Sequence, residues 1–309
     1  MAFIITSHKL SAETTLDFFR GLIFFSNYYF IYKFTQSYKI LEINVNNTLF
    51  TGKFFLHLPS VDSTNNYAKE LIAKSSPIDG TVILADEQYA GRGQVGNTWH
   101  SEAKQNLTFS IIFQTSFLRA TEQFWLNIAV SLGICDAVNS YLSGFGKLNS
   151  SSTALTATIK WPNDILIGTK KIAGILIENT IQGNFLKHSI IGIGINVNQT
   201  HFEDMNKITS MQLATGNRLQ RDVFFKELLL HIEHYFMLLK SKKLKRLKSE
   251  YVMKLYNYQK IGQYKKGDLR FEGKIIDVEQ SGVLVMEIFE NNTIRAVEKF
   301  MFKEIEFLR

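Results

Sequence analysis

A glycine-rich loop holds the first residues whose types and spacing could do chemistry. The segment GRGQVGNTWHSE has glycine at positions 91, 93 and 96, with Arg92 between the first two glycines and Trp99 after the third. Glycines let a backbone approach a ligand closely, and backbone N–H groups together with a guanidinium neutralise an anion. The loop is therefore typical of a lid over a phosphate-bearing ligand, with Trp99 covering an apolar or planar surface.

The same spacing, G-x-G-x-x-G, also occurs in dinucleotide-binding turns. That fingerprint needs a helix directly after the glycines and an acidic residue roughly 20 positions further on. Here the polar segment NTWHSEAKQ leads instead into an apolar, β-branched run, NLTFSIIFQ. The sequence therefore disfavours a dinucleotide-binding fold.

A second polar group lies where a predicted strand turns. Lys160 ends the run TATIK, and the turn WPND that follows contains Asn163 and Asp164. Side chains that a rigid scaffold projects from a turn are frequent functional residues, although a lone strand lysine usually points to solvent. Both interpretations of Lys160 remain open from these residues alone.

Ser63 and Thr64 stand at the start of a predicted helix. Their side-chain oxygens could accept hydrogen bonds from the open N–H groups of the first turn, so Ser63 is either a helix cap or a ligand-binding residue. Gly192 and Gly194 pose a similar choice, because glycines in a strand mark the close approach of another backbone or of a ligand.

The elements that must position these residues form an α/β (α+β) core. Five segments rich in β-branched or aromatic residues are predicted to be strands, at residues 81–88, 106–114, 156–168, 170–181 and 188–198. Apolar residues at helical spacing predict helices at Glu122–Leu142 and Arg221–Leu239. Strands joined largely by hairpins and flanked by helices predict a mixed sheet.

The chain is expected to have three regions. Residues 1–52 form an aromatic-rich extension without a recognisable helix-turn-helix, targeting signal or membrane span. Residues 53–256 form the core, in which the Gly/Ser/Thr-rich segment 143–156 is predicted to be a surface loop. Residues 257–309 form a small β-barrel-like module, with strands predicted at 268–278, 282–289 and 293–302.

The composition is that of a globular protein with a substantial core. Of the 309 residues, 45% are hydrophobic and 20% are charged. The formal charge is +7, and much of the excess lies at Lys240–Lys254, where Leu244, Leu247 and Tyr251 recur at helical spacing. That run is better explained as the solvated face of a helix than as a nucleic-acid patch.

Cys135 is the only cysteine, so disulfides within the chain are excluded. It lies on the apolar stripe of the predicted helix Glu122–Leu142, where a small core residue is expected rather than a nucleophile. The low cysteine content is consistent with a cytoplasmic protein.

Five motifs, in this order and at compatible spacings, resemble those of the biotin protein ligases. They are DSTN at 62–65, EQYAGRGQVGNTWHS at 87–101, KWPNDIL at 160–166, KKIAGILIE at 170–178 and GIGINVN at 192–198. The resemblance implies a class II synthetase-like biotin/lipoate ligase catalytic domain and a C-terminal SH3-like domain. It also implies an ATP-dependent biotin–[biotin carboxyl-carrier protein] ligase. Such an enzyme activates biotin to biotinyl-5'-AMP, with Mg²⁺ present, and transfers it to a lysine of a carrier domain.

The resemblance also implies a role for each matched residue. Biotin would be bound by residues of the helix start, a strand end, the lid and the WPND strand: Ser63, Thr64, Asn65, Gln88, Arg92, Gly93, Gln94 and Lys160. The nucleotide would be bound by Arg92, Trp99, Asn163, Asp164 and Asn196. Lys160 and Arg92 would be the catalytic cations, because activating a carboxylate with ATP brings two anions together. Asp164 is the candidate Mg²⁺ ligand.

This chain departs from the family pattern at two places. Gln94 stands where some members have a second arginine, so we expect the adenylate to be retained less by charge and more by packing. Some members also repress transcription through an N-terminal helix-turn-helix, which is not recognisable here. We therefore expect a ligase, monomeric or homodimeric, without specific DNA binding.

Two other functions remain as alternatives. Lipoate or octanoate ligation uses a related scaffold and the same adenylate chemistry, but its expected Arg-Arg and triple-glycine signature is missing. A non-catalytic protein that binds biotin or a nucleotide is disfavoured by the full set of charged and amide residues.

Overall fold

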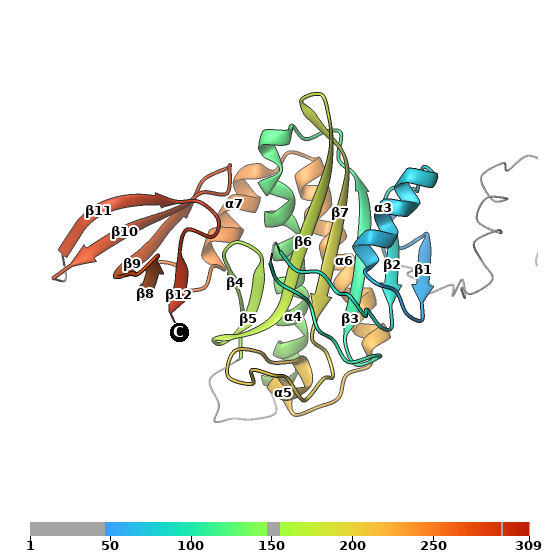
Figure 1. The fold of residues 1–309 in the computed structure, drawn as a ribbon, viewed down its shortest axis with the longest axis horizontal. Helices are drawn as coiled ribbons and strands as arrows, with labels where there is room; N and C mark the ends of the chain where they lie inside the picture. Colours follow the sequence, from blue (N-terminus) through green and yellow to red (C-terminus); the bar gives the residue numbers. More distant parts are fainter. Residues whose placement is uncertain (1–46, 95, 147–154, 292, 309) are drawn as a thin grey trace, which may run out of the picture. The chain divides into compact units, whose positions relative to one another are not determined.

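The computed structural model describes residues 47–94, 96–146, 155–291 and 293–308 (Figure 1). Most of the predicted extension at 1–52 lies outside these residues, as does most of the predicted loop at 143–156. The first residues of that loop are helical instead, because the preceding helix continues to Gly146.

A seven-stranded mixed sheet forms the centre of the described chain (Figure 1). From one edge to the other, its strands are β1 (Phe55–Leu58), β2 (Thr81–Ala85), β3 (Leu107–Gln114), β7 (Phe185–Ile195), β6 (Lys170–Gln182), β5 (Asp164–Ile167) and β4 (Ala157–Lys160). Strands β1 and β2 are parallel, and every other pair of neighbours is antiparallel. The predicted mixed sheet is confirmed.

The segment 156–168, predicted as one strand, is a hairpin. The WPND turn separates β4 from β5 and places Lys160 opposite Asp164 in the antiparallel register. The prediction also missed β1, since its four residues are too few for a period-2 pattern to stand out.

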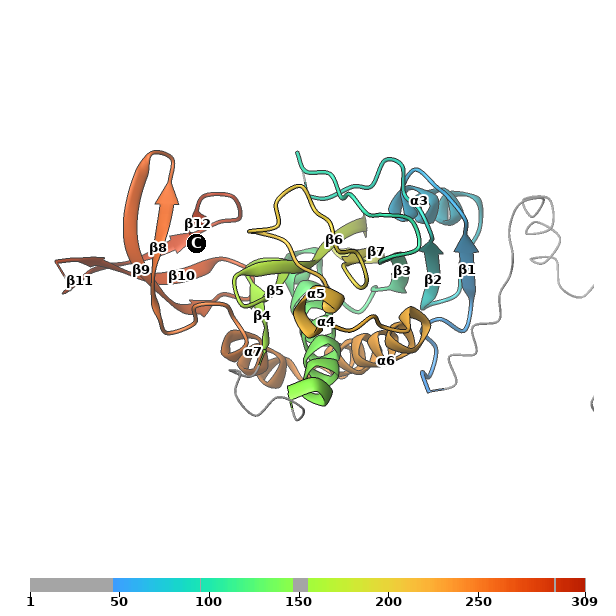
Figure 2. The same ribbon diagram turned by 90° about the horizontal axis from the view of Figure 1, so that it is seen from below.

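Helices cover both faces of the sheet, as Figure 2 shows. Helix α3 (Thr64–Lys74) lies on one face. The opposite face is covered by α4 (Phe124–Gly146), α6 (Arg221–Lys240) and α7 (Leu244–Met253). A 3₁₀ helix (Ala120–Glu122) precedes α4, and the short α5 (Met211–Thr215) follows β7. Helix α3 is thus separated from the other helices by the sheet.

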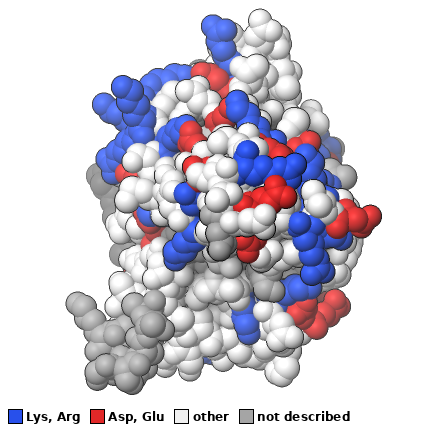
Figure 3. All heavy atoms as spheres, turned by 90° about the vertical axis from the view of Figure 1, so that its left-hand side faces the viewer, with Lys and Arg blue, Asp and Glu red and all other residues white. Residues whose placement is uncertain are grey.

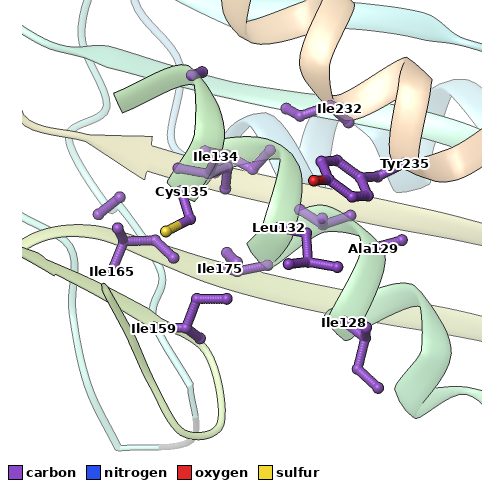
Figure 4. Packing of buried hydrophobic residues seen from close by; sticks show 14 of the residues in the cluster. Ile128, Ala129, Leu132, Ile134, Cys135, Ile159, Ile165, Ile175, Ile232 and Tyr235 are labelled. Carbon is purple, nitrogen blue, oxygen red and sulfur yellow. The ribbon is translucent and has the colours of Figure 1, made fainter. Parts of the chain in front are cut away.

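Cys135 is part of the core between α4 and the sheet. Figure 4 shows its sulfur among the side chains of Ile159, Ile165 and Ile175. The thiol is fully buried, and this burial raises the pKa of Cys135 to about 12. The thiolate needed for nucleophilic chemistry is therefore suppressed, as expected for a core residue.

A five-stranded antiparallel sheet follows the core. Its order is β11 (Thr293–Phe300), β10 (Leu284–Glu290), β9 (Leu269–Val278), β8 (Ile261–Lys266) and β12 (Glu306–Leu308). The three predicted strands correspond to β9, β10 and β11, whereas β8 and β12 were not predicted. A small antiparallel sheet of this kind is compatible with the expected SH3-like module.

The segment between α7 and the second sheet is hydrogen-bonded to the edge of the first. The N–H of Ile159 on β4 donates to the carbonyl of Lys254 at 2.8 Å, and the N–H of Tyr256 donates back to Ile159 at 2.8 Å. On the other side of the WPND turn, the indole N–H of Trp161 donates to the carbonyl of Gly282 at 2.9 Å. These bonds fix the second sheet beside the strand that ends in Lys160.

The basic run Lys240–Lys254 contains the whole of α7, with Leu247 and Tyr251 buried against the core. Its charges are partly paired, for example Arg246 with Glu250 and Lys248 with Asp277. Figure 3 shows the face at the C-terminal sheet, where Lys and Arg lie among Asp and Glu. The expected solvated helix face is confirmed. None of the helices described is both long and apolar enough to cross a membrane.

Glu233 of α6 fixes the start of the described chain. Its buried carboxylate accepts the backbone N–H groups of Leu49, Phe50 and Thr51, at 2.5, 2.9 and 2.7 Å. A carboxylate in such a concave set of N–H groups is neutralised without a basic residue. The chain therefore enters the core at a fixed position on α6.

Candidate active site

A cavity of about 1010 Å³ lies over the α3 side of the central sheet and reaches the second sheet. Nearly all of the predicted site residues line it, namely Ser63, Thr64, Asn65, Gln88, Arg92, Gly93, Gln94, Trp99, Lys160, Asn163 and Asp164. Asn196 is not among the lining residues. Three separate segments of the sequence, 63–65, 88–99 and 160–164, thus come together at one cavity.

One end of the cavity is lined by hydroxyl and amide groups from the start of α3. The backbone N–H and the hydroxyl of Thr64 donate to Gln88 at 2.8 and 3.1 Å. The hydroxyl of Ser110 on β3 donates to the amide oxygen of Asn65 at 2.6 Å and lies 2.8 Å from the hydroxyl of Thr64. Ser63 occupies the N-cap position of α3, but its side chain makes no capping hydrogen bond. The capping interpretation of Ser63 is therefore not supported.

Gly192 makes room for this polar end. Gly192 is a residue of β7, and the side-chain amide of Asn65 from α3 packs against it. A methyl group at position 192 would overlap that amide. The glycine is therefore required by the close approach of a polar side chain to the strand.

Arg92 of the glycine-rich loop is bound to a carboxylate of β6. Its guanidinium donates to Glu178 at 2.8 Å and to Asn66 at 2.6 Å. Glu178 also accepts from Asn65 at 2.8 Å and from Lys69 at 2.6 Å. Burial opposes the charge, but the hydrogen bonds from Lys69, Asn65 and Arg92 outweigh it and lower the pKa of Glu178.

The other end of the cavity gathers cations around Asp164. Lys171 on β6 lies 2.7 Å from one oxygen of Asp164, and Lys160 lies 3.9 Å from the other. Lys171 was not among the predicted site residues, although it lies in the quoted motif KKIAGILIE. Two ammonium groups at one carboxylate form a site where further negative charge is stabilised.

Trp99 lies flat against the sheet between these two ends. A methyl group at Gly194 would overlap its indole ring, and the ammonium of Lys171 lies 5.8 Å from the ring centroid. The indole N–H is buried and has no hydrogen-bond partner in the described part of the chain. The indole therefore forms a wall of the cavity.

The two predicted nucleotide-binding asparagines are used by the fold itself. The amide of Asn163 donates to the carbonyl of Ile175 at 2.7 Å and ties the WPND turn to β6. The amide of Asn196 is buried and donates to Thr209 at 3.0 Å, away from the cavity. Asn163 also lines the cavity, and the role of both asparagines in nucleotide binding stays a prediction.

The second sheet contributes an aromatic residue that sequence reasoning missed. The ammonium of Lys160 lies 5.3 Å from the ring centroid of Phe307 on β12, and both residues line the cavity. Phe307 in turn packs against Tyr264 of β8, at a centroid distance of 5.1 Å. The position of Lys160 thus depends on both sheets.

Comparison with known proteins agrees with this arrangement. The sequence model described as "Biotin/lipoate A/B protein ligase family" matches residues 57–196. The bifunctional ligase/repressor BirA of Bacillus spizizenii is 30% identical over 263 residues, which are 82% of this chain and 74% of that protein. A biotin–[acetyl-CoA-carboxylase] ligase of Mycobacterium tuberculosis is 30% identical over 173 residues, or 54% of this chain and 60% of that protein.

A solved structure has the same fold. The biotin protein ligase of Aquifex aeolicus in complex with biotin and ATP superposes with a TM-score of 0.64 at 24% identity, over 83% of this chain and 99% of that one. The family model places the matched residues among the biotin and lipoate ligases. The sequence relatives show which of these two groups applies: the chain belongs to the biotin protein ligase family.

Proposed function

We propose that this chain is an ATP-dependent biotin–[biotin carboxyl-carrier protein] ligase. The observation that supports it is one cavity with an end lined by hydroxyl and amide groups and an end with two lysines, joined by an indole wall under a glycine-rich loop. Biotin has matching halves, a polar, uncharged ring system and a carboxylate at the end of an apolar chain. The activity is also that named for its sequence relatives.

The uncharged end suits the ureido group of biotin, which has one carbonyl acceptor and two N–H donors. Thr64, Asn65 and Gln88 are held by one another and by Ser110, so their hydrogen-bonding groups are oriented before a ligand arrives. The Ser63 hydroxyl, which makes no cap bond, completes the set. Preorganised polar groups bind without the cost of ordering them.

The cationic end suits the adenylation step. An oxygen of the biotin carboxylate attacks the α-phosphorus of ATP, the new C–O–P linkage forms, and pyrophosphate leaves with the electron pair of the broken P–O bond. Lys171, Lys160 and Arg92 stabilise the negative charge that collects between the two anions. When the loop closes, the Arg92 guanidinium has to break its hydrogen bond to Glu178 or to Asn66 and form one to the ligand.

Closure of the loop has a chemical purpose. Biotinyl-5'-AMP is a mixed anhydride that water hydrolyses, so a lid of residues 91–99 that excludes solvent preserves it until the acceptor arrives. A lysine amine of the carrier domain then attacks the acyl carbon, the amide C–N bond forms, and AMP leaves.

Mg²⁺ is expected to enter with ATP and to keep most of its contacts with phosphates and water. Among the described residues there is no group of three His, Cys, Asp or Glu side chains that could hold a metal ion. Asp164 is a fitting carboxylate for an ion that keeps most of its contacts with phosphates and water, although it faces Lys171 and Lys160. Asp164 would hold the ion, which supplies positive charge at the phosphates.

The acceptor that we propose is the biotin carboxyl carrier protein of a biotin-dependent carboxylase, which would place the reaction in the cytoplasm. We further propose a monomer or homodimer that does not bind a DNA operator. Saturable, sequence-specific DNA binding by the full chain would overturn the last point.

ATP–pyrophosphate exchange tests the proposed function. Purified protein with Mg²⁺ is assayed with biotin, lipoate and octanoate in parallel, alongside Lys171→Ala and Lys160→Ala. Exchange with biotin alone, strongly reduced in both variants, is the expected result. Exchange with lipoate or octanoate alone would favour the related ligases, and tight biotin binding without exchange would indicate a binding protein.

A further inference from the structure

A second cavity opens beside the first. It has a volume of about 440 Å³ and shares six lining residues with the main cavity, namely Gln94, Trp161, Pro162, Ile175, Leu176 and Phe302. Its remaining walls come from the start of α4, from β6 and from the loop between β9 and β10. A group that enters the second cavity therefore lies next to Gln94 of the lid and Trp161, which also line the site where the adenylate would form.

The two cavities differ in charge. Five cationic side chains and two carboxylates line the main cavity: Arg92, Lys160, Lys171, Lys207, Lys303, Asp164 and Glu306. No Asp, Glu, Lys or Arg is found among the described residues that line the second cavity. Its polar groups are amides and one hydroxyl, among them Gln123, Asn127, Asn179 and Ser281.

Several of these polar groups already have partners. The amide of Asn127 donates to the carbonyl of Pro162 at 2.5 Å, and that of Asn179 donates to Gln123 at 3.0 Å. The cavity therefore keeps its shape without charged groups. Its lining is apolar elsewhere, with Phe124, Ile177 and Val283 among the contributors.

Such a lining suits the second chemical step, in which the acceptor lysine attacks the adenylate. The acceptor lysine has an ordinary pKa of about 10.4 and must be deprotonated before it can attack. Transfer from water into uncharged surroundings lowers the pKa of an amine, and nearby cations lower it further. An amine that left this lining would meet Lys160 and Lys171 in the main cavity, which also disfavour its ammonium form.

The rim of the second cavity has the character of a protein contact. Met301 and Phe302, which line it, are 64% and 45% exposed. Exposed apolar side chains around a cavity mark a docking surface, and methionine and aromatic residues are enriched where proteins meet. The route therefore suits a side chain presented by a folded partner.

We propose that the second cavity admits the lysine side chain of the acceptor protein, and that its uncharged lining keeps the amine neutral. This inference rests on the proposed ligase function. In the step concerned, the neutral nitrogen forms a bond to the acyl carbon and loses one proton to water. The bond from that carbon to the phosphate oxygen breaks, and AMP leaves with the electron pair.

One experiment blocks the route. Ser281 is exposed in the β9–β10 loop, so Ser281→Trp fills the mouth without disturbing the core. Preformed biotinyl-5'-AMP on the enzyme is offered either to an apo biotin carboxyl carrier domain or to hydroxylamine, a small nucleophile. Transfer to the carrier is expected to fall about tenfold or more, as for loss of a central contact. Trapping by hydroxylamine and ATP–pyrophosphate exchange should stay within about twofold.

A second experiment introduces charge without changing shape. Gln123 is exposed and accepts a hydrogen bond from Asn179, which Gln123→Glu retains. The added carboxylate stabilises the ammonium form, so the midpoint of the pH–rate profile for transfer should rise by about one pH unit. Gln182→Glu, the same change at an exposed position outside the cavity lining, serves as the control and should leave the profile unchanged.

The outcomes separate this inference from the function on which it rests. No exchange with biotin in the unsubstituted protein would overturn the proposed function. Normal exchange together with unchanged transfer to the carrier in Ser281→Trp, or with an unshifted profile in Gln123→Glu, would overturn the acceptor route alone. Equal losses of carrier transfer and hydroxylamine trapping in Ser281→Trp would also contradict it.

Discussion

Arg92 and Glu178 lie 2.8 Å apart, and the same carboxylate also accepts a hydrogen bond from Asn65. One glutamate of β6 thus connects the cation of the lid with an amide that we propose binds biotin. The state of the lid and the orientation of the biotin-binding end are therefore linked through a single side chain.

Glu178→Ala should weaken biotin binding. Asn65 and Arg92 both lose an ionised partner, and a hydrogen bond to a charged group contributes about 1.5–3 kcal/mol. We expect the dissociation constant for biotin, measured by calorimetry without ATP, to rise about tenfold. Glu70→Ala, which removes an exposed ion pair with Lys74 on the same helix as Asn65, is the control. Equal affinities for the two variants would show that Glu178 has no such role.

Phe307→Leu should slow adenylation. The aromatic face near the ammonium of Lys160 contributes about 0.5–2 kcal/mol, which corresponds to a loss of about two- to thirtyfold. ATP–pyrophosphate exchange measures it, and Phe307→Tyr should retain most of the rate. Phe289→Leu removes a similar contact, with Lys274 at 5.7 Å in the same sheet but outside the cavity lining, and should be harmless. If both leucine variants behave alike, the contact with Lys160 does not matter.

Gln94→Arg should retain the adenylate longer. An added cation on the lid would give the phosphate one more charge-assisted hydrogen bond, and about 1 kcal/mol slows release about fivefold. Release of labelled biotinyl-5'-AMP into a quench of excess unlabelled ligand measures this rate. Gln182→Arg adds the same charge outside the cavity. Unchanged release in Gln94→Arg would contradict the view that packing replaces charge in this lid.

Glu233→Gln should destabilise the protein without changing its chemistry. The amide offers one acceptor oxygen in place of a carboxylate that binds three backbone N–H groups, and the expected loss is about 2 kcal/mol. For a chain of this size the melting temperature should fall by about 4–8 °C. Exposed Glu227 on the same helix supplies the control, Glu227→Gln. A melting temperature within one degree of the parent in both variants would show that Glu233 does not stabilise the start of the described chain.

The sequence predicted the core of the site because its residues are close together in short motifs. The lid, the helix start and the WPND turn each contain their polar residues within a few positions, and the long apolar strands around them predict the sheet. The sequence did not predict which residues of one motif contact residues of another. Glu178 lies in a predicted strand, but nothing local indicates that it meets Arg92, 86 positions away.

Lys171 illustrates the limit of strand patterns. Lys170 and Lys171 are adjacent, and the choice between them depends on the register of β5 with β6, which shifts between Ile165 and Leu166. In the structure Lys170 donates to the carbonyl of Met205, whereas Lys171 binds Asp164. Phe307 could not be predicted for a related reason. Strand β12 has only three residues, and the contact joins Phe307 of the second sheet to Lys160 of the first.

The hydrogen bonds between Ile159 and the segment Lys254–Tyr256 have a consequence for solubility. Strand β4 ends the central sheet, and an end strand with unpaired N–H and C=O groups is a template for pairing with strands of other molecules. Here the chain returns from α7 and occupies part of that edge. The strand that ends in Lys160 is thus protected from aggregation by the same few residues that connect the two sheets.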